Sequence, residues 1–131
     1  MPRFAKFLRQ TIVALIAVLA CGPLLAGGDH GGASGPEPLI FTVNLGNSTY
    51  LHFGLILETA TPEAGHELGL FRPKIQHEII LLLSGKDPGH LRTLPGKKEL
   101  VEEIIEAVNH VIHSNEKNGV KEALFTKFII Q

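Results

Sequence analysis

The spacing of the apolar residues changes twice along this chain, and this change constrains the fold more than composition does. From residue 39 to residue 58 apolar and polar residues alternate, which is the period of a half-buried β-strand. Between residues 73 and 114 the apolar residues recur every three or four positions, as in an amphipathic helix. Alternation returns from residue 120 to residue 131. The predicted order of elements is therefore strand, strand, helix, helix, strand.

The first two strands are expected to form a hairpin, because Gly46, Asn47 and Ser48 between them favour a tight turn. One face of the second strand carries four apolar residues, which are Leu51, Phe53, Leu55 and Leu57. In the closing strand, simple alternation predicts one face with Phe125, Lys127 and Ile129. The opposite face is expected to carry Leu124, Phe128 and Ile130. This apolar strand is predicted to be a sheet edge, where a neighbouring copy can pair.

Two helices are predicted between the strands. The first covers residues 73–83, and its inward positions are Ile75, Ile79, Leu82 and Leu83. The second covers residues 94–114, with an apolar stripe formed by Leu100, Val101, Ile104, Ile105, Val108, Val111 and Ile112. The opposite, polar face of this helix is expected to carry Glu102, Glu103, Glu106, Asn109 and His113. Thr61 and Pro62 predict the start of a short preceding helix, whereas residues 86–89 are expected to form a loop.

The simplest packing of these elements is a small, three-stranded antiparallel sheet that the helices cover on one face. The sequence therefore predicts a mixed α/β fold of the α+β class, in the order β-β-α-α-β. Cys21 is the single cysteine of the 131 residues, so no intrachain disulfide supports this domain.

The N-terminal segment has the layout of an export signal. Residues 1–10 are basic, and residues 11–20 read TIVALIAVLA before Cys21, Gly22 and Pro23. Even the longer run over residues 11–26 is shorter than the roughly 20 apolar residues of a spanning helix. We expect residues 1–26 to be a signal peptide or a short membrane anchor, residues 27–38 to be a flexible Gly/Pro linker, and residues 39–131 to be an exported domain.

Three fates of the N-terminal segment remain open at this point. It is a cleaved signal peptide, a lipoprotein signal or an uncleaved anchor. The stretch from Val18 to Cys21 resembles the lipobox of bacterial lipoproteins, in which the cysteine is acylated, although Leu19 replaces the usual small residue. Cys21 is therefore a possible lipidation site. All three fates place the residues after about position 30 outside the cytoplasm.

The charge balance argues against a nucleic-acid partner. Residues 1–20 contain Arg3, Lys6 and Arg9 and no acid, so the rest of the chain has nine Lys and Arg against 13 Asp and Glu. Binding to phosphates needs clustered basic residues, and only Lys97 and Lys98 are adjacent. A mildly acidic domain of this kind is expected to bind nucleic acid poorly.

No catalytic motif emerges from the sequence. His77-Glu78 and His66-Glu67 lack the second histidine of a zinc-protease motif, and no nucleophile elbow or phosphate loop is present. Glu106, His110 and His113 have the spacing of one helical face and are the best alternative, a metal centre of an envelope enzyme. We interpret them as a solvated helix face, and we predict no catalytic, cofactor-binding or metal site.

The order of several short motifs resembles the flagellar basal-body-associated FliL family. The resemblance covers roughly residues 37–131. Its motifs are Phe41-Thr42-Val43-Asn44-Leu45, Tyr50-Leu51-His52-Phe53, Lys74-Ile75 through Leu82-Leu83-Ser84, Thr93-Leu94-Pro95-Gly96-Lys97 followed by Leu100, Glu103-Ile104 and Asn109, Gly119-Val120, and residues 124–131, which read LFTKFIIQ.

This resemblance implies a function. Members of the family are periplasmic accessories of the flagellar motor, with a stomatin-like domain that associates with the stator units and supports rotation. The resemblance therefore implies a non-enzymatic protein of the basal body, important for motility and chemotaxis, which forms homo-oligomers and is held at the periplasmic side of the inner membrane by its N-terminal segment. The alternative is a general envelope lipoprotein or adaptor that reuses the domain outside the flagellum.

Overall fold

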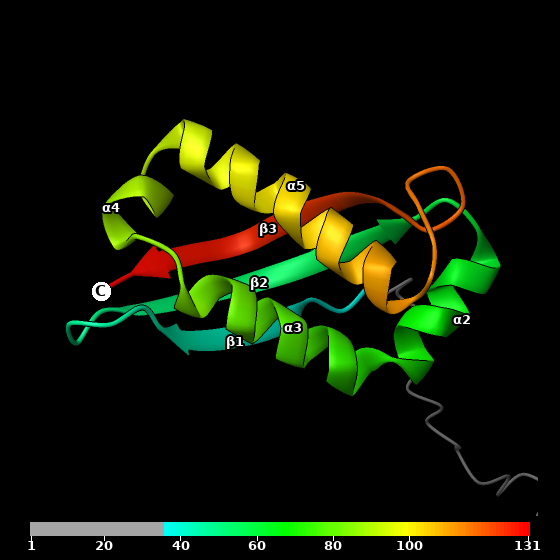
Figure 1. Ribbon diagram of the computed structural model, residues 1–131, viewed down its shortest axis with the longest axis horizontal. Helices are drawn as coiled ribbons and strands as arrows, with labels where there is room; N and C mark the ends of the chain where they lie inside the picture. Colours follow the sequence, from blue (N-terminus) through cyan, green and yellow to red (C-terminus); the bar gives the residue numbers. More distant parts are fainter. Residues whose placement is uncertain (1–35) are drawn as a thin grey trace, which may run out of the picture. The chain divides into compact units, whose positions relative to one another are not determined.

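The computed structural model describes residues 36–131 and confirms the α+β class. Figure 1 shows the elements in chain order: β1 (Leu39–Asn44), β2 (Tyr50–Thr59), α2 (Pro62–Leu70), α3 (Arg72–Ser84), α4 (Pro88–Leu91), α5 (Leu94–Val111) and β3 (Val120–Ile130). The predicted signal segment, Cys21 and most of the linker lie outside the described residues. Within residues 36–131, no helix has the length and apolar character that crossing a membrane requires.

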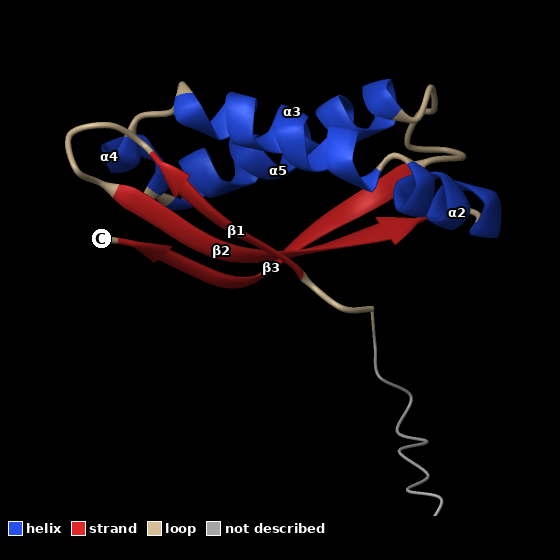
Figure 2. Ribbon diagram, turned by 90° about the horizontal axis from the view of Figure 1, so that it is seen from below, coloured by secondary structure: helices blue, strands red, loops and turns tan. Residues whose placement is uncertain are grey.

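The three strands form one antiparallel sheet in the order β1-β2-β3, and the helices lie on one of its faces (Figure 2). The central strand β2 pairs Phe53 with Phe41 on one side and with Phe128 on the other. As predicted, the closing strand β3 is an edge of the sheet, and β1 is the other edge.

A bulge in β3 corrects the predicted faces of this strand. Gly54 pairs with Lys127 and Leu55 pairs with Phe125, which leaves Thr126 as an extra residue. The extra residue reverses the alternation, because two neighbouring side chains then point to the same side. Phe125 therefore joins Phe128 and Ile130 against the core, whereas simple alternation had placed it on the opposite face from them.

The core lies between the sheet and the helical layer. Phe53 is fully buried at its centre, stacks on Phe41 with 4.8 Å between ring centroids, and meets the edge of Phe125 at 5.8 Å. The helices contribute the predicted apolar stripes, with Ile79 and Ile104 fully buried. Burial of these side chains is the main favourable contribution to folding.

Asn109 is the one buried polar side chain among the described residues, and the prediction that it lies on the solvated face is wrong. Its Nδ2 donates to the carbonyl oxygen of Val120 at 2.8 Å, and its Oδ1 accepts from the backbone N–H of Val120 at 2.7 Å. The amide thereby joins α5 to the first residue of β3. Gly119 permits this approach, since a Cβ there would lie 2.2 Å from the Asn109 Oδ1.

Side chains cap the first turns of α2, α4 and α5, whereas α3 begins after Phe71 without a side-chain cap. Thr61 Oγ1 accepts from the N–H of Ala64 at 3.2 Å, and Thr93 Oγ1 accepts from Gly96 at 3.0 Å. Part of the predicted loop at residues 86–89 is instead the start of α4, where Asp87 accepts from His90 at 2.7 Å. A four-residue helix is too short to show a hydrophobic period, so the sequence pattern did not reveal it.

Replacement of Asn109 by alanine is expected to lower the free energy of unfolding by about 2–4 kcal/mol, because it leaves a buried N–H and a buried carbonyl without partners. Urea unfolding followed by circular dichroism measures this change. Asn44→Ala is the matched control, since Asn44 also accepts from a backbone N–H (Gly46, 2.7 Å) but is exposed. It is expected to cost less than about 1 kcal/mol, and equal losses in both variants would contradict the proposed role of burial.

Candidate functional site

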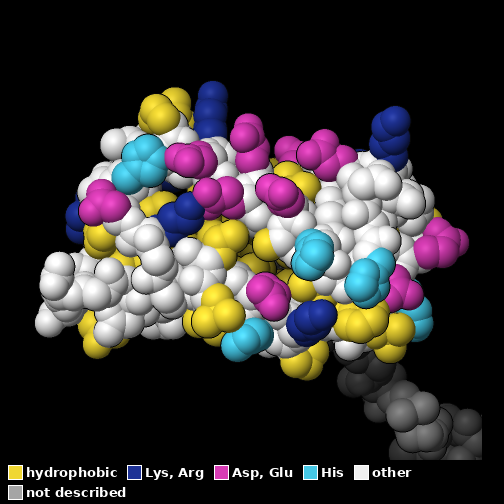
Figure 3. Space-filling view, viewed as in Figure 1, with side chains coloured by type: hydrophobic (Ala, Val, Ile, Leu, Met, Phe, Trp, Pro, Cys, Tyr) yellow, Lys and Arg dark blue, Asp and Glu magenta, His cyan; other side chains and the backbone are white. Residues whose placement is uncertain are grey.

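The outer face of α5 carries an acidic ridge, which we define as Glu99, Glu102 and Glu106. All three side chains are exposed, and Figure 3 shows acidic side chains gathered over this helix. The neighbouring Glu103 is half-buried and accepts from Lys86 Nζ at 2.6 Å. Lys86 thus neutralises Glu103 and ties the end of α3 to α5, whereas Glu102 and Glu106 form no ion pair within residues 36–131.

Two open grooves flank the acidic ridge. The groove toward α3 has a volume of about 570 Å³, and Leu82 and Ala107 contribute apolar surface to it. The groove toward the start of β3 has a volume of about 720 Å³ and contains Lys121. Glu106 and His110 line both grooves. The ridge is therefore a raised, negatively charged line between two hollows, a shape that suits contact with another macromolecule.

The alternative metal centre is not formed. Glu106 and His110 lie one turn apart on α5, but this helix ends at Val111. His113 follows in a left-handed conformation with φ of 54°, so helical spacing no longer places it beside them. Within the described part of the chain, no three His, Cys, Asp or Glu side chains converge to hold a metal ion.

The corner between α4 and α5 explains part of the Thr93–Lys97 motif. A Cβ at Gly96 would lie 2.1 Å from the carbonyl oxygen of His90, so only glycine allows the two helices to approach this closely. Lys97 Nζ donates to the carbonyl oxygen of Arg92 at 2.8 Å and lies 5.2 Å from the centre of the Phe128 ring. The motif therefore joins the corner to β3 and has a structural role.

His90 and Glu99 form an exposed pair at the same corner, with 2.7 Å between Nε2 and Oε2. The hydrogen bond to His90 and the charge of His90 lower the pKa of the Glu99 carboxyl below its ordinary value of 4.5. Helical spacing did not predict this pair, since His90 lies in a separate, four-residue helix. The fold brings the two residues together because the chain turns at Arg92 and Thr93, and Gly96 lets α5 pack closely against His90.

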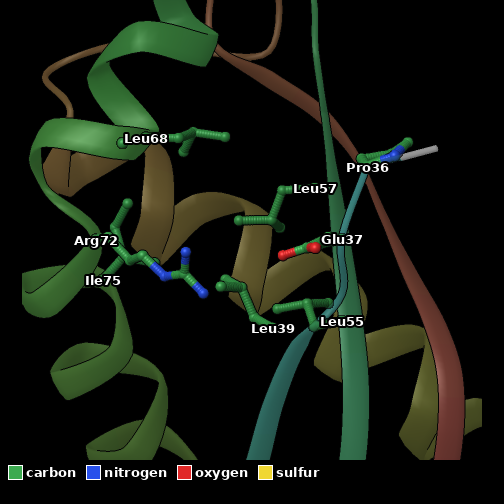
Figure 4. A pocket seen from close by; sticks show the side chains of 9 residues that line it. Pro36, Glu37, Leu39, Leu55, Leu57, Leu68, Arg72 and Ile75 are labelled. Carbon is green, nitrogen blue, oxygen red and sulfur yellow. The ribbon is translucent and has the colours of Figure 1, made fainter. Parts of the chain in front are cut away.

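A small apolar pocket of about 170 Å³ lies between the sheet and α2–α3, where the described chain begins (Figure 4). Leu39, Leu55, Leu57, Leu68 and Ile75 supply most of its walls. Figure 4 shows the Arg72 guanidinium and the Glu37 carboxylate directed toward the pocket from opposite walls. Such a pocket suits an apolar side chain with a polar neighbour.

Comparison with known proteins gives one consistent result. The family model described as flagellar basal body-associated protein FliL matches residues 38–131. The chain is 30% identical over 94 residues to the "Flagellar protein FliL" of Aquifex aeolicus, a match that covers 70% of this chain and 56% of the relative. It is 31% identical over 93 residues to the Escherichia coli K12 protein of the same name, covering 70% and 60%. The match thus spans less than two thirds of each relative.

The pH dependence of stability is expected to reveal the His90–Glu99 pair. Because the pKa of Glu99 is lowered in the folded state, the pair stabilises the fold above pH 4.5 and loses this effect as the pH falls through the lowered pKa. The melting temperature of the natural chain should therefore exceed that of Glu99→Gln at pH 6, with a gap that closes below pH 4.5. Glu102→Gln is the control, and the same closing gap in that variant would contradict the assignment.

Proposed function

The chain belongs to the FliL family of flagellar basal body-associated proteins, and from this premise we propose that it is a non-enzymatic accessory of the flagellar motor. The observation that carries the proposal is the extent of the family match, which includes every strand and helix from β1 to β3. In this proposal the domain associates with stator units and supports flagellar rotation, and through rotation motility and chemotaxis.

The proposed location is the periplasmic side of the inner membrane at the basal body. The signal-like sequence of residues 1–26 supports export. Residues 27–38 are rich in Gly and Pro, a composition typical of a linker between an anchor and a domain. Membrane association then depends on whether the segment is retained, or is acylated at Cys21. In this proposal the tether lets the domain contact the motor while the N-terminal segment holds the chain at the membrane.

The proposed contact surface for the motor is the acidic ridge with its two grooves. Glu102 and Glu106 are exposed and have no cationic partner among the described residues, so a basic segment of another protein would complement them. Leu82 and Ala107 in the adjacent groove offer apolar contact beside these charges. Charged rims with an apolar floor are the usual composition of a transient interface.

Self-association is the remaining part of the proposal. Both outer strands of the sheet, β1 and β3, are edges in the described part of the chain. An edge strand presents unpaired backbone groups that a neighbouring copy can pair with. Phe128 lies on β3 but packs against Phe53 and Phe125 in the core, so a substitution there would alter the core together with the edge.

The test of the motor assignment is a crosslinking pull-down of the tagged full-length chain from flagellated cells, with mass spectrometry of the recovered proteins. Recovery of stator or basal-body proteins is expected, and deletion of the gene should reduce swimming, most strongly in viscous medium. Clean recovery of unrelated envelope proteins, with normal swimming of the deletion strain, would support the envelope adaptor and overturn the motor assignment.

Charge reversal on the ridge tests the proposed contact surface. The double variant Glu102→Lys/Glu106→Lys should reduce recovery of motor proteins roughly tenfold or more, because like charges then face each other across the contact. Both positions are exposed, so the fold is expected to survive. Glu63→Lys on α2 is the matched control, since Glu63 is also exposed and lines neither groove, and it should leave recovery unchanged. Unchanged recovery in the double variant would place the contact elsewhere on the domain.

A further inference from the structure

The apolar pocket of Figure 4 shares no residue with the acidic ridge or with its two grooves. It lies where the described chain begins, between the sheet and the corner of α2 with α3. Leu55 and Ile75 are buried in its walls, whereas Leu39, Leu57 and Leu68 are only partly buried. Covering partly exposed aliphatic side chains with another apolar group is favourable. The pocket is therefore suited to a small apolar group.

Two opposite charges face this apolar hollow. The Glu37 carboxylate and the Arg72 guanidinium are directed toward it from opposite walls (Figure 4). Within residues 36–131 neither of them forms an ion pair, so they do not neutralise each other by direct contact. A ligand with both a carboxylate and an ammonium group would give each of them an oppositely charged partner. The charges of the pocket are thus complementary to a zwitterion.

The volume of the pocket, about 170 Å³, limits what can fill it. A cavity of about 150 Å³ with apolar walls holds a molecule of benzene. The pocket therefore accommodates one branched aliphatic side chain, with the charged groups of the same molecule at its rim. The acyl chain of a lipid or a segment of a peptide is too large to be enclosed in this volume.

We propose that this pocket binds a free aliphatic α-amino acid of the size of valine or leucine. The carboxylate of the ligand accepts hydrogen bonds from the Arg72 guanidinium, and its ammonium group donates to the Glu37 carboxylate. Its side chain packs against Leu39, Leu57 and Leu68, the partly buried part of the wall. An α-amino acid is the smallest molecule that joins these three groups on one carbon atom.

The bound amino acid would form a charged bridge between two segments of the fold. Glu37 directly precedes β1 and belongs to the predicted linker, whereas Arg72 is the first residue of α3. Occupancy of the pocket therefore fixes the position at which the linker joins the domain. Because the pocket and the acidic ridge have no residue in common, the amino-acid site and the motor contact can each fail without the other.

Isothermal titration calorimetry of the purified full-length chain with leucine tests the site. The chain is kept in glyco-diosgenin, a detergent whose steroid rings are too large for the pocket. Because both charged side chains are exposed, a dissociation constant of about 0.1–10 mM is expected. Leucinamide lacks the carboxylate and 4-methylpentanoate lacks the ammonium group, so each should bind roughly tenfold more weakly than leucine. Glycine, which has no side chain to bury, should give no saturable heat.

Variants of the chain separate the charges from the cavity. Arg72→Gln and Glu37→Gln should each weaken leucine binding roughly tenfold. Gly69→Leu fills the pocket from its wall and should abolish binding. A Cβ at Gly69 would contact no atom within 4 Å, and leucine favours a helix over glycine, so the fold is expected to survive. Gly65→Leu, at an exposed position of α2 outside the pocket, is the matched control and should bind leucine normally.

The melting temperature of each variant, measured in the same detergent, shows that the fold is retained. Unchanged leucine binding in Gly69→Leu would place the site elsewhere and overturn the proposal. Leucinamide that binds as tightly as leucine would overturn the zwitterion and indicate the N-terminus of a peptide instead. Absence of saturable leucine binding by the natural chain up to roughly 50 mM would overturn the site altogether. None of these results changes the recovery of motor proteins, which the pull-down measures separately.

Discussion

The burial of one sheet face beneath α3 and α5 is the constraint on which the rest of this structure depends. Phe53 on the central strand contacts aromatic rings from both neighbouring strands, and Ile79 and Ile104 close the core from the helical side. In a domain of this size, a single core of this kind supplies most of the favourable free energy of folding. Within residues 36–131 the helices have no second sheet to pack on, so this core fixes where they lie and which of their side chains face outward.

The Asn109 amide gives this packing its register. Apolar contacts alone tolerate small shifts of a helix along a sheet, whereas two hydrogen bonds to the backbone of Val120 do not. A buried amide with both bonds made specifies one arrangement, since any other leaves polar groups unpaired. At the far end of α5, Gly96 and Lys97 hold the helix against α4 and β3. Two of the motifs on which the family resemblance rests thus maintain the scaffold.

The consequence for function is a division of the surface. The helical layer presents a charged ridge between two grooves, and the uncovered face of the sheet presents exposed apolar side chains. Binding surfaces of these two kinds differ in what they recognise, because charge directs encounter with a partner and apolar area supplies its stability. The proposed role as a motor accessory that also associates with itself requires two separate surfaces of this sort, and the fold provides room for both.

The sequence by itself determined the class of fold, the hairpin and the two main helices, because hydrophobic period and turn residues are properties of neighbours along the chain. It also carried the family resemblance, which follows the order of motifs. Only the tertiary structure decided that Asn109 is buried, that the bulge at Thr126 turns Phe125 inward, and that His113 leaves the helical face. It alone also brought His90 to Glu99. Each of these depends on contacts between distant segments, and helical or strand spacing contains no information about such contacts.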